Sequence, residues 1–410
     1  MAKGPWSILG AAVPSQEPEA IQRRYRNSFL ALAAIFGPLA VIVIGIQLKY
    51  GDISLVYQKV FESLTALGLK KGLPIWVPAA VALLIPCVLI ATLFHAAPLV
   101  LVWWEQKIAA HVQIRMGPMR VGRFHGILQT VADGIKLLLK EDIVPAGADK
   151  WVHLLAPVVV VVPAYVAYAP LTFGRGLVGT DLDTGTLFVM AVSGLSTIGL
   201  LMAGWGSNNK YSALGGLRAA AQVVSYEIPR VISLLPVVMW AGTLSLSGIA
   251  QAQEGLWAGF LPRWFIFYPF VGQVAYLIFL ICTVAETNRV PFDIAEAESE
   301  LVSGFNTEYS GMKFALFFMA EYAYVFLGAA VGTALFFGGG AAPWRFLNFI
   351  PSYVWFFGKT CAQVFFIILF RWTYPRMRVD RLMEFCWKFL LPWSLVNVAV
   401  AGALILWRMR

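Results

Sequence analysis

The sequence predicts an all-α membrane protein that crosses the bilayer several times. Hydrophobic residues make up 59% of the 410 residues and charged residues only 13%, and the mean hydropathy is +0.73. Uncharged runs recur that reach the roughly 20 residues a helix needs to cross the hydrocarbon core. Because lipid offers no hydrogen bonds to the backbone, such runs are expected to be helical.

Nine spans are expected, one of them in an N-terminal extension. The extension, residues 1–74, starts with a polar tail and holds a span at 29–48. A cleaved signal peptide is not expected, because the apolar run begins late and no small-residue cleavage pattern follows it. The membrane domain proper covers residues 75–410. Its spans are expected at 79–103, 151–173, 187–205, 219–246, 264–285, 313–337, 346–371 and 389–407.

The loop at 105–150 contains an amphipathic pattern. Apolar residues recur at helical spacing on one side of it, and charged residues occupy the other side. The apolar residues are Ile127, Val131, Ile135 and Leu138, and the charged ones are Asp133 and Lys136. This pattern predicts a helix lying in the membrane interface. A plain surface helix without a further role is the alternative.

Positive charge is unevenly distributed between the loops. The net charge is +9, which in a membrane protein indicates topology rather than nucleic-acid binding. About two thirds of the 31 Lys and Arg residues fall in the N-terminal tail and in loops 105–150, 207–218, 285–313 and 371–388. These segments are therefore expected on the cytoplasmic side, and the C-terminus on the opposite side.

The sequence lacks the common signatures of bound redox groups. Its four cysteines, at positions 87, 282, 361 and 386, form no C-x-x-C pair, so neither an iron–sulfur cluster nor a zinc site is expected in this chain. No G-x-G-x-x-G follows a strand-like run, so nucleotide binding is not expected. Any redox cofactor is expected in partner subunits.

Acidic residues are concentrated in the segment 285–311, between two apolar runs. It holds one arginine, Arg289, and six acids: Glu286, Asp293, Glu296, Glu298, Glu300 and Glu308. A further carboxylate, Glu321, lies in the following span. Carboxylates beside a low-dielectric layer are costly, which favours a functional role for them.

A helix after Pro291 would place Asp293, Glu296 and Glu300 on one face. Like charges at that spacing, together with partial burial, raise the proton affinity of the group. Such a cluster holds or passes protons near neutral pH and titrates collectively. The alternative is a solvated acidic loop at the membrane surface.

Glu227 is expected about two turns inside the span at 219–246. An acid at that depth costs roughly 2.5–3.5 kcal/mol on insertion scales, so it must be neutral, paired or hydrated. The functional interpretation is a proton-carrying group. The structural alternative is an ion pair with Arg230, three residues further on.

Four motifs in the cytoplasmic loops carry a family resemblance. The acidic segment reads E-x-N-R-x-P-F-D-x-x-E-x-E-S-E-L-V-x-G-F-x-x-E-Y from Glu286 to Tyr309. The other motifs include W-W-E-Q-K, Q-I-R-M-G-P and R-W-T-Y-P-R-M-R. Together they resemble the quinone-site membrane subunit of respiratory complex I, which in bacteria is the H subunit. The family usually has arginine where this chain has Gln106, and glutamine supplies no charge.

The resemblance implies eight family spans and a membrane subunit of proton-pumping NADH:quinone oxidoreductase in the bacterial cytoplasmic membrane. It implies no complete active site in this chain alone. Its substrate would be quinone, with NADH, FMN and iron–sulfur clusters in partner subunits. The implied partners are the iron–sulfur and quinone-site subunits of the peripheral arm, small and antiporter-like membrane subunits, and membrane lipid, but no nucleic acid.

The resemblance also assigns candidate site residues. The quinone chamber is expected to involve Glu105, Lys107, Arg115, Asp133, Lys136, Phe292, Glu298, Phe305 and Arg376. The proton path is expected to involve Glu227, Glu286, Asp293, Glu296, Glu300, Glu308 and Glu321. A negative charge that arises when quinone is reduced is expected to shift the protonation of these acids.

Three alternatives remain. The first is the equivalent subunit of a membrane-bound hydrogenase or of a ferredoxin- or deazaflavin-linked dehydrogenase. The second is a stand-alone ion transporter, which predicts internal repeats that the sequence does not show. The third is a structural membrane anchor, which leaves the intramembrane acids unexplained.

Overall fold

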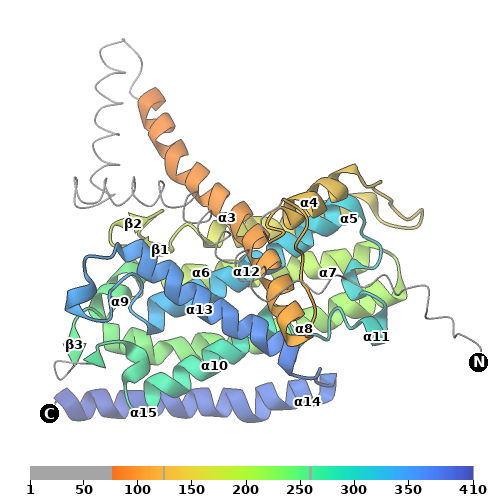
Figure 1. Ribbon diagram of the computed structural model, residues 1–410. Helices are drawn as coiled ribbons and strands as arrows, with labels where there is room; N and C mark the ends of the chain where they lie inside the picture. The colour runs from red at the N-terminus through yellow and green to blue at the C-terminus, as the bar shows by residue number, and fades with distance from the viewer. Residues whose placement is uncertain (1–75, 123–124, 258–260, 410) are drawn as a thin grey trace, which may run out of the picture.

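The computed structural model describes residues 76–122, 125–257 and 261–409, and most of these are helical (Figure 1). The predicted span at 29–48 and the rest of the extension lie outside the described residues. Within the described ranges, six helices have the length and composition to cross a membrane. They are α5 (Lys150–Ala167), α6–α7 (Gly185–Gly206), α8 (Lys210–Ala241), α12 (Gly311–Phe336), α13 (Ser352–Thr373) and α14–α15 (Val379–Arg408). The expectation of an all-α membrane protein is confirmed.

Two further apolar helices complete the described bundle. α3 (Trp76–Val112) contains the predicted span at 79–103 and projects beyond the other helices at its N-terminal end (Figure 1). α10 (Val271–Glu286) has 16 residues, fewer than the span predicted at 264–285. It is shorter because a 3-10 turn, η2 (Phe265–Phe267), occupies the start of that segment.

Helix α12 forms the centre of the bundle. It packs against α3, α5 and α13, while α8 packs against α7, α10 and α15. In the most apolar 18-residue stretch of α12, 67% of the residues are buried, whereas in the corresponding stretch of α14–α15 only 22% are buried. Glu321, which α12 carries, is therefore held among other helices, whereas α15 (Leu391–Met409) presents apolar side chains outward, as a lipid-facing helix does.

The two ends of the bundle differ in character. One end gathers the motif-bearing segments, among them α4 (Gln129–Leu139), α11 (Glu298–Leu301) and η3 (Gly304–Asn306) (Figure 1). The other end gathers α9 (Leu246–Ala252), the C-terminus and two short hairpins that the sequence did not predict (Figure 1). The hairpins pair β1 (Thr172–Gly174) with β2 (Leu177–Val178) and β3 (Leu256–Trp257) with β4 (Leu261–Pro262).

Helix α8 begins earlier than predicted. The Asn209 side chain accepts a hydrogen bond from the Tyr211 amide at 3.0 Å and caps the first turn. The segment predicted as a loop at 207–218 is therefore mostly helical. The helix ends at Gly242, whose φ of +70° suits glycine and whose amide donates to the Val238 carbonyl at 2.8 Å. Glu227 thus lies near the middle of α8, not two turns from its start.

The span predicted at 187–205 is interrupted at Leu195, between α6 (Gly185–Gly194) and α7 (Ser196–Gly206). The Leu195 amide donates to the Val192 carbonyl, and the Ile198 amide donates to the Leu195 carbonyl, both at 3.2 Å. These bonds span three residues, so the helix tightens locally and leaves backbone groups less regularly bonded.

Other predicted bounds shift for local reasons. α5 ends at Ala167 instead of residue 173, because the chain turns at Pro170 and enters β1. The last span begins earlier than predicted, with α14 (Val379–Glu384) and a π-helical turn, η5 (Phe385–Leu390). The predicted amphipathic helix is present as α4, and its apolar residues Val131, Ile135 and Leu138 are exposed.

Candidate functional site

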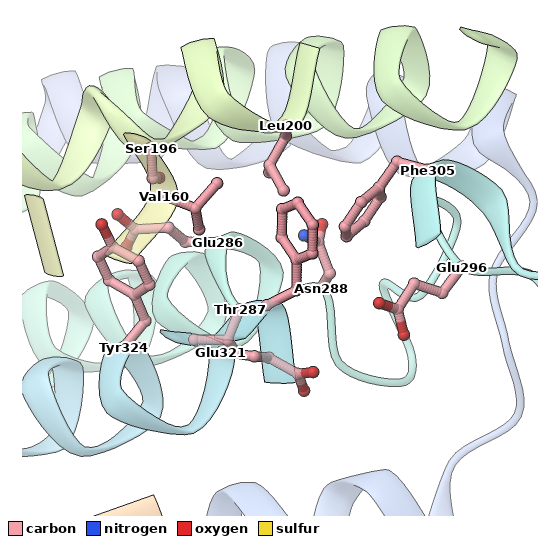
Figure 2. A pocket seen from close by; sticks show the side chains of 11 residues that line it. Val160, Ser196, Leu200, Glu286, Thr287, Asn288, Glu296, Phe305, Glu321 and Tyr324 are labelled. Carbon is pink, nitrogen blue, oxygen red and sulfur yellow. The ribbon is translucent and has the colours of Figure 1, made fainter. Parts of the chain in front are cut away.

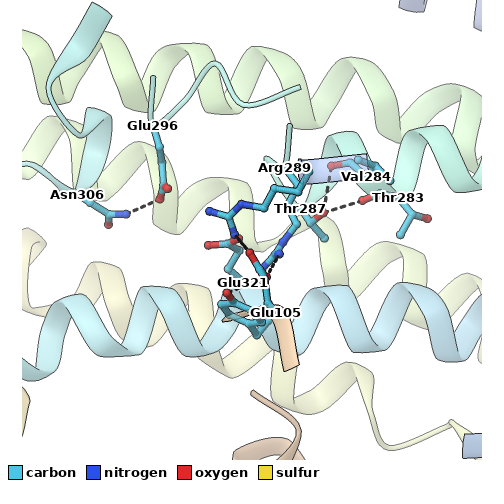
Figure 3. Close-up of polar contacts among 10 residues, drawn as sticks. Glu105, Thr283, Val284, Thr287, Arg289, Glu296, Asn306 and Glu321 are labelled. Atoms are coloured by element: carbon cyan, nitrogen blue, oxygen red, sulfur yellow. Dashed lines mark hydrogen bonds and ion pairs between the residues drawn. The ribbon is translucent and has the colours of Figure 1, made fainter. Parts of the chain in front are cut away.

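A buried charge network, formed by Glu105, Arg289, Glu321 and Arg371, lies where α3, α12 and α13 meet the acidic segment. Glu105 of α3 is only 4% exposed. Its Oε2 accepts hydrogen bonds from Arg289 Nη1 at 2.5 Å and from the Tyr322 hydroxyl at 3.0 Å, and its Oε1 accepts from Arg371 Nη1 at 2.6 Å. Figure 3 shows the side chains of Arg289, Glu105 and Glu321 gathered together. Segments far apart in the sequence are therefore joined through one carboxylate.

Arg289 is the hub of this network. Its Nη2 lies 3.1 Å from Glu321 Oε1, and its guanidinium carbon lies 4.3 Å from the centre of the Tyr322 ring. Burial opposes the charge, but Glu105 and Glu321 outweigh it and raise the pKa of Arg289 well above its ordinary value. Two carboxylates and two guanidinium groups balance one another, as buried charges must.

Glu296 differs from Glu105, because its surroundings disfavour a negative charge. Its Oε1 accepts a hydrogen bond from Asn306 Nδ2 at 2.6 Å (Figure 3). Removal from water, together with the charges of Glu321 and Asp293, raises its pKa to about 8. Glu296 is therefore mostly protonated at neutral pH.

A cavity connects Glu296 with two other acids. It is lined by Val160, Ser196, Leu200, Glu286, Thr287, Asn288, Glu296, Phe305, Phe317, Glu321 and Tyr324. In Figure 2, Glu296 lies at one end and Glu286, Ser196 and Tyr324 at the other, with Glu321 along the side. The space open to the centres of water molecules is about 40 Å³, enough for roughly three waters. Water there would link the carboxyl groups by hydrogen bonds.

Beyond the cavity, the acids continue into α8. Glu286 forms an ion pair with the buried Arg230, whose guanidinium carbon lies 5.4 Å from the centre of the Phe279 ring. The structural alternative for Glu227, an ion pair with Arg230, is therefore not the arrangement found, because Arg230 pairs with Glu286. The carboxylate of Glu227 instead faces Gly194, the last residue of α6.

The prediction that Asp293, Glu296 and Glu300 share a helix face is wrong. Among these residues only Glu300 is in a helix, the four-residue α11. The acids are held by separate partners from distant segments. Asp293 pairs with Arg376 at 2.7 Å, Glu300 with Arg218 at 2.6 Å, and Glu308 accepts from Asn209 at 2.6 Å.

The remaining predicted chamber residues divide into two groups. Lys107 holds the turn after α3, because its Nζ donates to the Pro118 carbonyl at 2.5 Å. Asp133 accepts from Gln129 at 3.1 Å, while Arg115 and Lys136 are exposed. Any chamber role for Arg115 and Lys136 thus requires a partner to cover this surface.

The predicted aromatic walls have different environments. Phe305 lines the cavity, whereas Phe292 is buried against the Tyr226 ring, with centroids 5.4 Å apart, and serves as packing. The side chain of Glu298 lies outside the described set. The amide oxygen of Gln106, where the resemblance leads one to expect arginine, is buried and has no hydrogen-bond partner among the described residues.

Sequence reasoning did not assign roles to Tyr322, Tyr324 or Arg371, and it considered Arg230 only as a partner of Glu227. The two tyrosines follow Glu321 in the pattern E-Y-A-Y, and hydroxyl groups beside an intramembrane acid were an available signal. Gln222 was missed as well. Its buried amide donates to the carbonyls of Ala285 and Phe292, both at 2.7 Å, and ties the acidic segment to α8.

Comparisons with known proteins agree with this geometry. A family model described as NADH dehydrogenase matches residues 84–402. A Geobacillus kaustophilus protein, named as the H subunit of NADH-quinone oxidoreductase, is 50% identical over 303 residues, covering 74% of this chain and 88% of the relative. The chain belongs to this H-subunit family. Relatives of the same name from Bacillus cytotoxicus and Bacillus thuringiensis are 50% and 51% identical over 294 residues, covering 72% of this chain and 85% of each relative.

Membership of the H-subunit family decides between the alternatives from the sequence. The resemblance found in the loop motifs is confirmed. The equivalent subunit of a hydrogenase or a ferredoxin-linked dehydrogenase is not favoured, since the relatives carry the name of the quinone-reducing enzyme. The family model begins at residue 84, so it says nothing of the extension.

Proposed function

We propose that this chain, a membrane subunit of proton-translocating NADH:quinone oxidoreductase, helps to form the quinone chamber and couples quinone reduction to proton transfer through buried carboxylates. The observation that carries the proposal is the cavity lined by Glu296, Glu321 and Glu286. A hydrated cavity joining three acids is a route that protons can follow, and it starts in the acidic segment that identifies the family.

The chamber end of this route is the network around Glu105. Arg289 and Arg371 supply fixed positive charge there, and Glu105 and Glu321 balance it. Lys107, Asp293 with Arg376, Phe305 and Glu298 belong to the same set of family positions. Arg115, Asp133 and Lys136 contribute from the loop that a peripheral-arm subunit covers.

Reduction of quinone introduces negative charge beside this network until protons arrive. At an effective dielectric constant of about 20, a unit charge about 4 Å from a carboxylate changes its energy by about 4 kcal/mol. That corresponds to about three pKa units. Such a change is large enough to move a proton onto Glu321 or to hold one on Glu296.

From the cavity the proton path continues toward the membrane partners. Glu286 receives the proton, Arg230 links it electrostatically to α8, and Glu227 is the next acid. Glu227 is partly exposed, and a small or antiporter-like membrane subunit would continue the path from there. Glu300 and Glu308 are the acids through which the cytoplasmic surface supplies protons.

The wider arrangement follows from the same proposal. The chain has eight family spans in residues 75–410 and one more at 29–48 in the extension 1–74. Its motif loops and N-terminus face the bacterial cytoplasm, and its C-terminus faces the periplasm. Iron–sulfur subunits of the peripheral arm deliver electrons from NADH through FMN, so this chain supplies protein groups and no redox centre.

Replacement of the path acids in the assembled complex tests the proposal. Vesicles containing complexes with Glu321→Gln or Glu227→Gln should lose NADH-driven proton pumping, because glutamine cannot carry a proton. Glu254→Gln, in an exposed pair with Arg175 at the other end of the bundle, is the matched control and should pump normally. Unchanged pumping in both path variants would remove the proposed path.

A further inference from the structure

The interruption of α6–α7 meets Glu227 at a glycine. A Cβ atom added to Gly194 would lie 2.5 Å from Glu227 Oε1 and 3.1 Å from both Cδ and Oε2. Contacts below 3.0 Å do not occur for real Cβ atoms, so any side chain at position 194 must displace this carboxylate. The carboxylate of Glu227 therefore lies directly against the last turn of α6.

The same interruption borders the cavity. Ser196, the first residue of α7, lines the cavity together with Tyr324 and Glu286 (Figure 2). The hydroxyl of Thr197 is buried and has no hydrogen-bond partner among the described residues. Ser196, which lines the cavity, thus lies two residues from Gly194, which the carboxylate of Glu227 faces. Interrupted membrane helices are places where water and ions reach the backbone.

We propose that Gly194 is a positioning residue for proton transfer. Because it has no side chain, Glu227 can extend across to the α6–α7 interruption and exchange a proton with water that enters from the cavity past Ser196. The inference rests on the proposed function, since it concerns the step between the cavity and Glu227. It adds that the length of the Glu227 side chain and the absence of one at position 194 are matched.

This match predicts losses of pumping that packing alone does not produce. Gly194→Ala fills the space of the carboxylate and should abolish pumping while NADH oxidation by quinone continues. Glu227→Asp is one methylene shorter, withdraws from the interruption and should also abolish pumping. In the double variant, the shorter acid fits beside the added methyl but still does not reach the interruption, so pumping should stay lost although the packing conflict is relieved. A double-mutant cycle separates reach from packing.

The assay uses the assembled complex in vesicles and records protons pumped per NADH oxidised. Gly328→Ala is the matched control, because a Cβ there would press against Thr283 Cγ2, an equally tight contact without an acid. It should leave the ratio of protons to NADH unchanged even if less complex assembles. Normal pumping by the Glu227→Asp variant, alone or in the Gly194→Ala background, would overturn the inference.

The inference and the proposed function can fail separately. If Glu227→Gln pumps normally, Glu227 is not on the path and both fail. If Glu227→Gln stops pumping while Gly194→Ala pumps normally, the path stands and the positioning role is overturned. Loss of pumping in both single variants and in the Gly194→Ala, Glu227→Asp double variant is the result expected.

Discussion

Replacing Glu296 with glutamine removes an acid whose proton affinity the fold raises far above normal. The interval between the ordinary pKa of 4.5 and about 8 corresponds to about 5 kcal/mol in favour of the protonated form, at 1.36 kcal/mol for each unit. At pH 7 the protonated form of Glu296 should outnumber the ionised form by about ten to one. Glutamine imitates the protonated form but cannot release the proton.

The direction of the pH effect on stability follows from this shift. Between about pH 4.5 and pH 8 the folded protein keeps a proton on Glu296 that the unfolded chain releases. Stability therefore falls as the pH rises through this window and levels off above it. Glu296→Gln should remove this part of the pH dependence, so the variant should be stabilised relative to the parent complex above about pH 8.

Infrared difference spectroscopy of the assembled complex measures the proton itself. A carboxylic-acid band that is present in the parent and missing in Glu296→Gln should disappear as the pH passes about 8. Thermal unfolding of the same two complexes across this pH range gives the stability. Glu254→Gln, on an exposed acid at the other end of the bundle, should change neither measurement.

Two results would refute the reasoning. The first is a band that depends on Glu296 but titrates near 4.5, which would mean that the Asn306 hydrogen bond stabilises an ionised carboxylate more than burial and the charges of Glu321 and Asp293 destabilise it. The second is an equal pH dependence of stability in the parent and in Glu296→Gln. Either result would place the poised proton of the cavity on another group.

The other predictions concern ion pairs at different depths. Glu105→Gln leaves the buried Arg289 and the partly buried Arg371 short of a partner. It should cost about 3–5 kcal/mol, measured as a lower melting temperature of the complex, and an unchanged temperature would contradict the network. Glu286→Gln should similarly destabilise the complex by about 3–5 kcal/mol because it strands the buried Arg230. Adding Arg230→Met to Glu286→Gln should recover most of that loss. If the losses of stability in the two single variants simply add in the double variant, the ion pair between Arg230 and Glu286 is not supported. Arg376→Ala should cost less than about 1 kcal/mol, because that pair is partly exposed and screened; a larger loss would mean that Arg376 supports more than its ion pair.

Hydropathy predicted the membrane class but not where the helices begin and end. Length and composition identify spans because a bilayer sets both. The start of α8 depends on one side chain, Asn209, that caps its first turn. The interruption at Leu195 lies within a run that has no charged residue, so a search for long uncharged runs gives no sign of it. The two hairpins are too short to produce a periodic pattern.

The candidate site was predicted as a set of residues but not as an arrangement. The motif located Glu286, Glu296 and Arg289 in one segment, and the intramembrane position drew attention to Glu321. The prediction that the acids share one helix face was wrong, because they are held by partners from other segments, such as Arg376 for Asp293. Pairings between residues so far apart in the sequence depend on how the helices pack. The spacing of residues within one segment carries no information about that packing.

The arrangement explains how one site can hold charge and still respond to it. The charge of Glu105 is balanced by Arg289 and Arg371, so a proton has little to gain by joining Glu105. Glu296 lies just outside that balance, with its proton held by burial and by Glu321. A new negative charge in the chamber is therefore felt most at the acids whose protonation is least fixed, those along the cavity. Since the cavity ends at Ser196 and the α6–α7 interruption, a proton displaced along it reaches Glu227 only where Gly194 leaves room for that carboxylate.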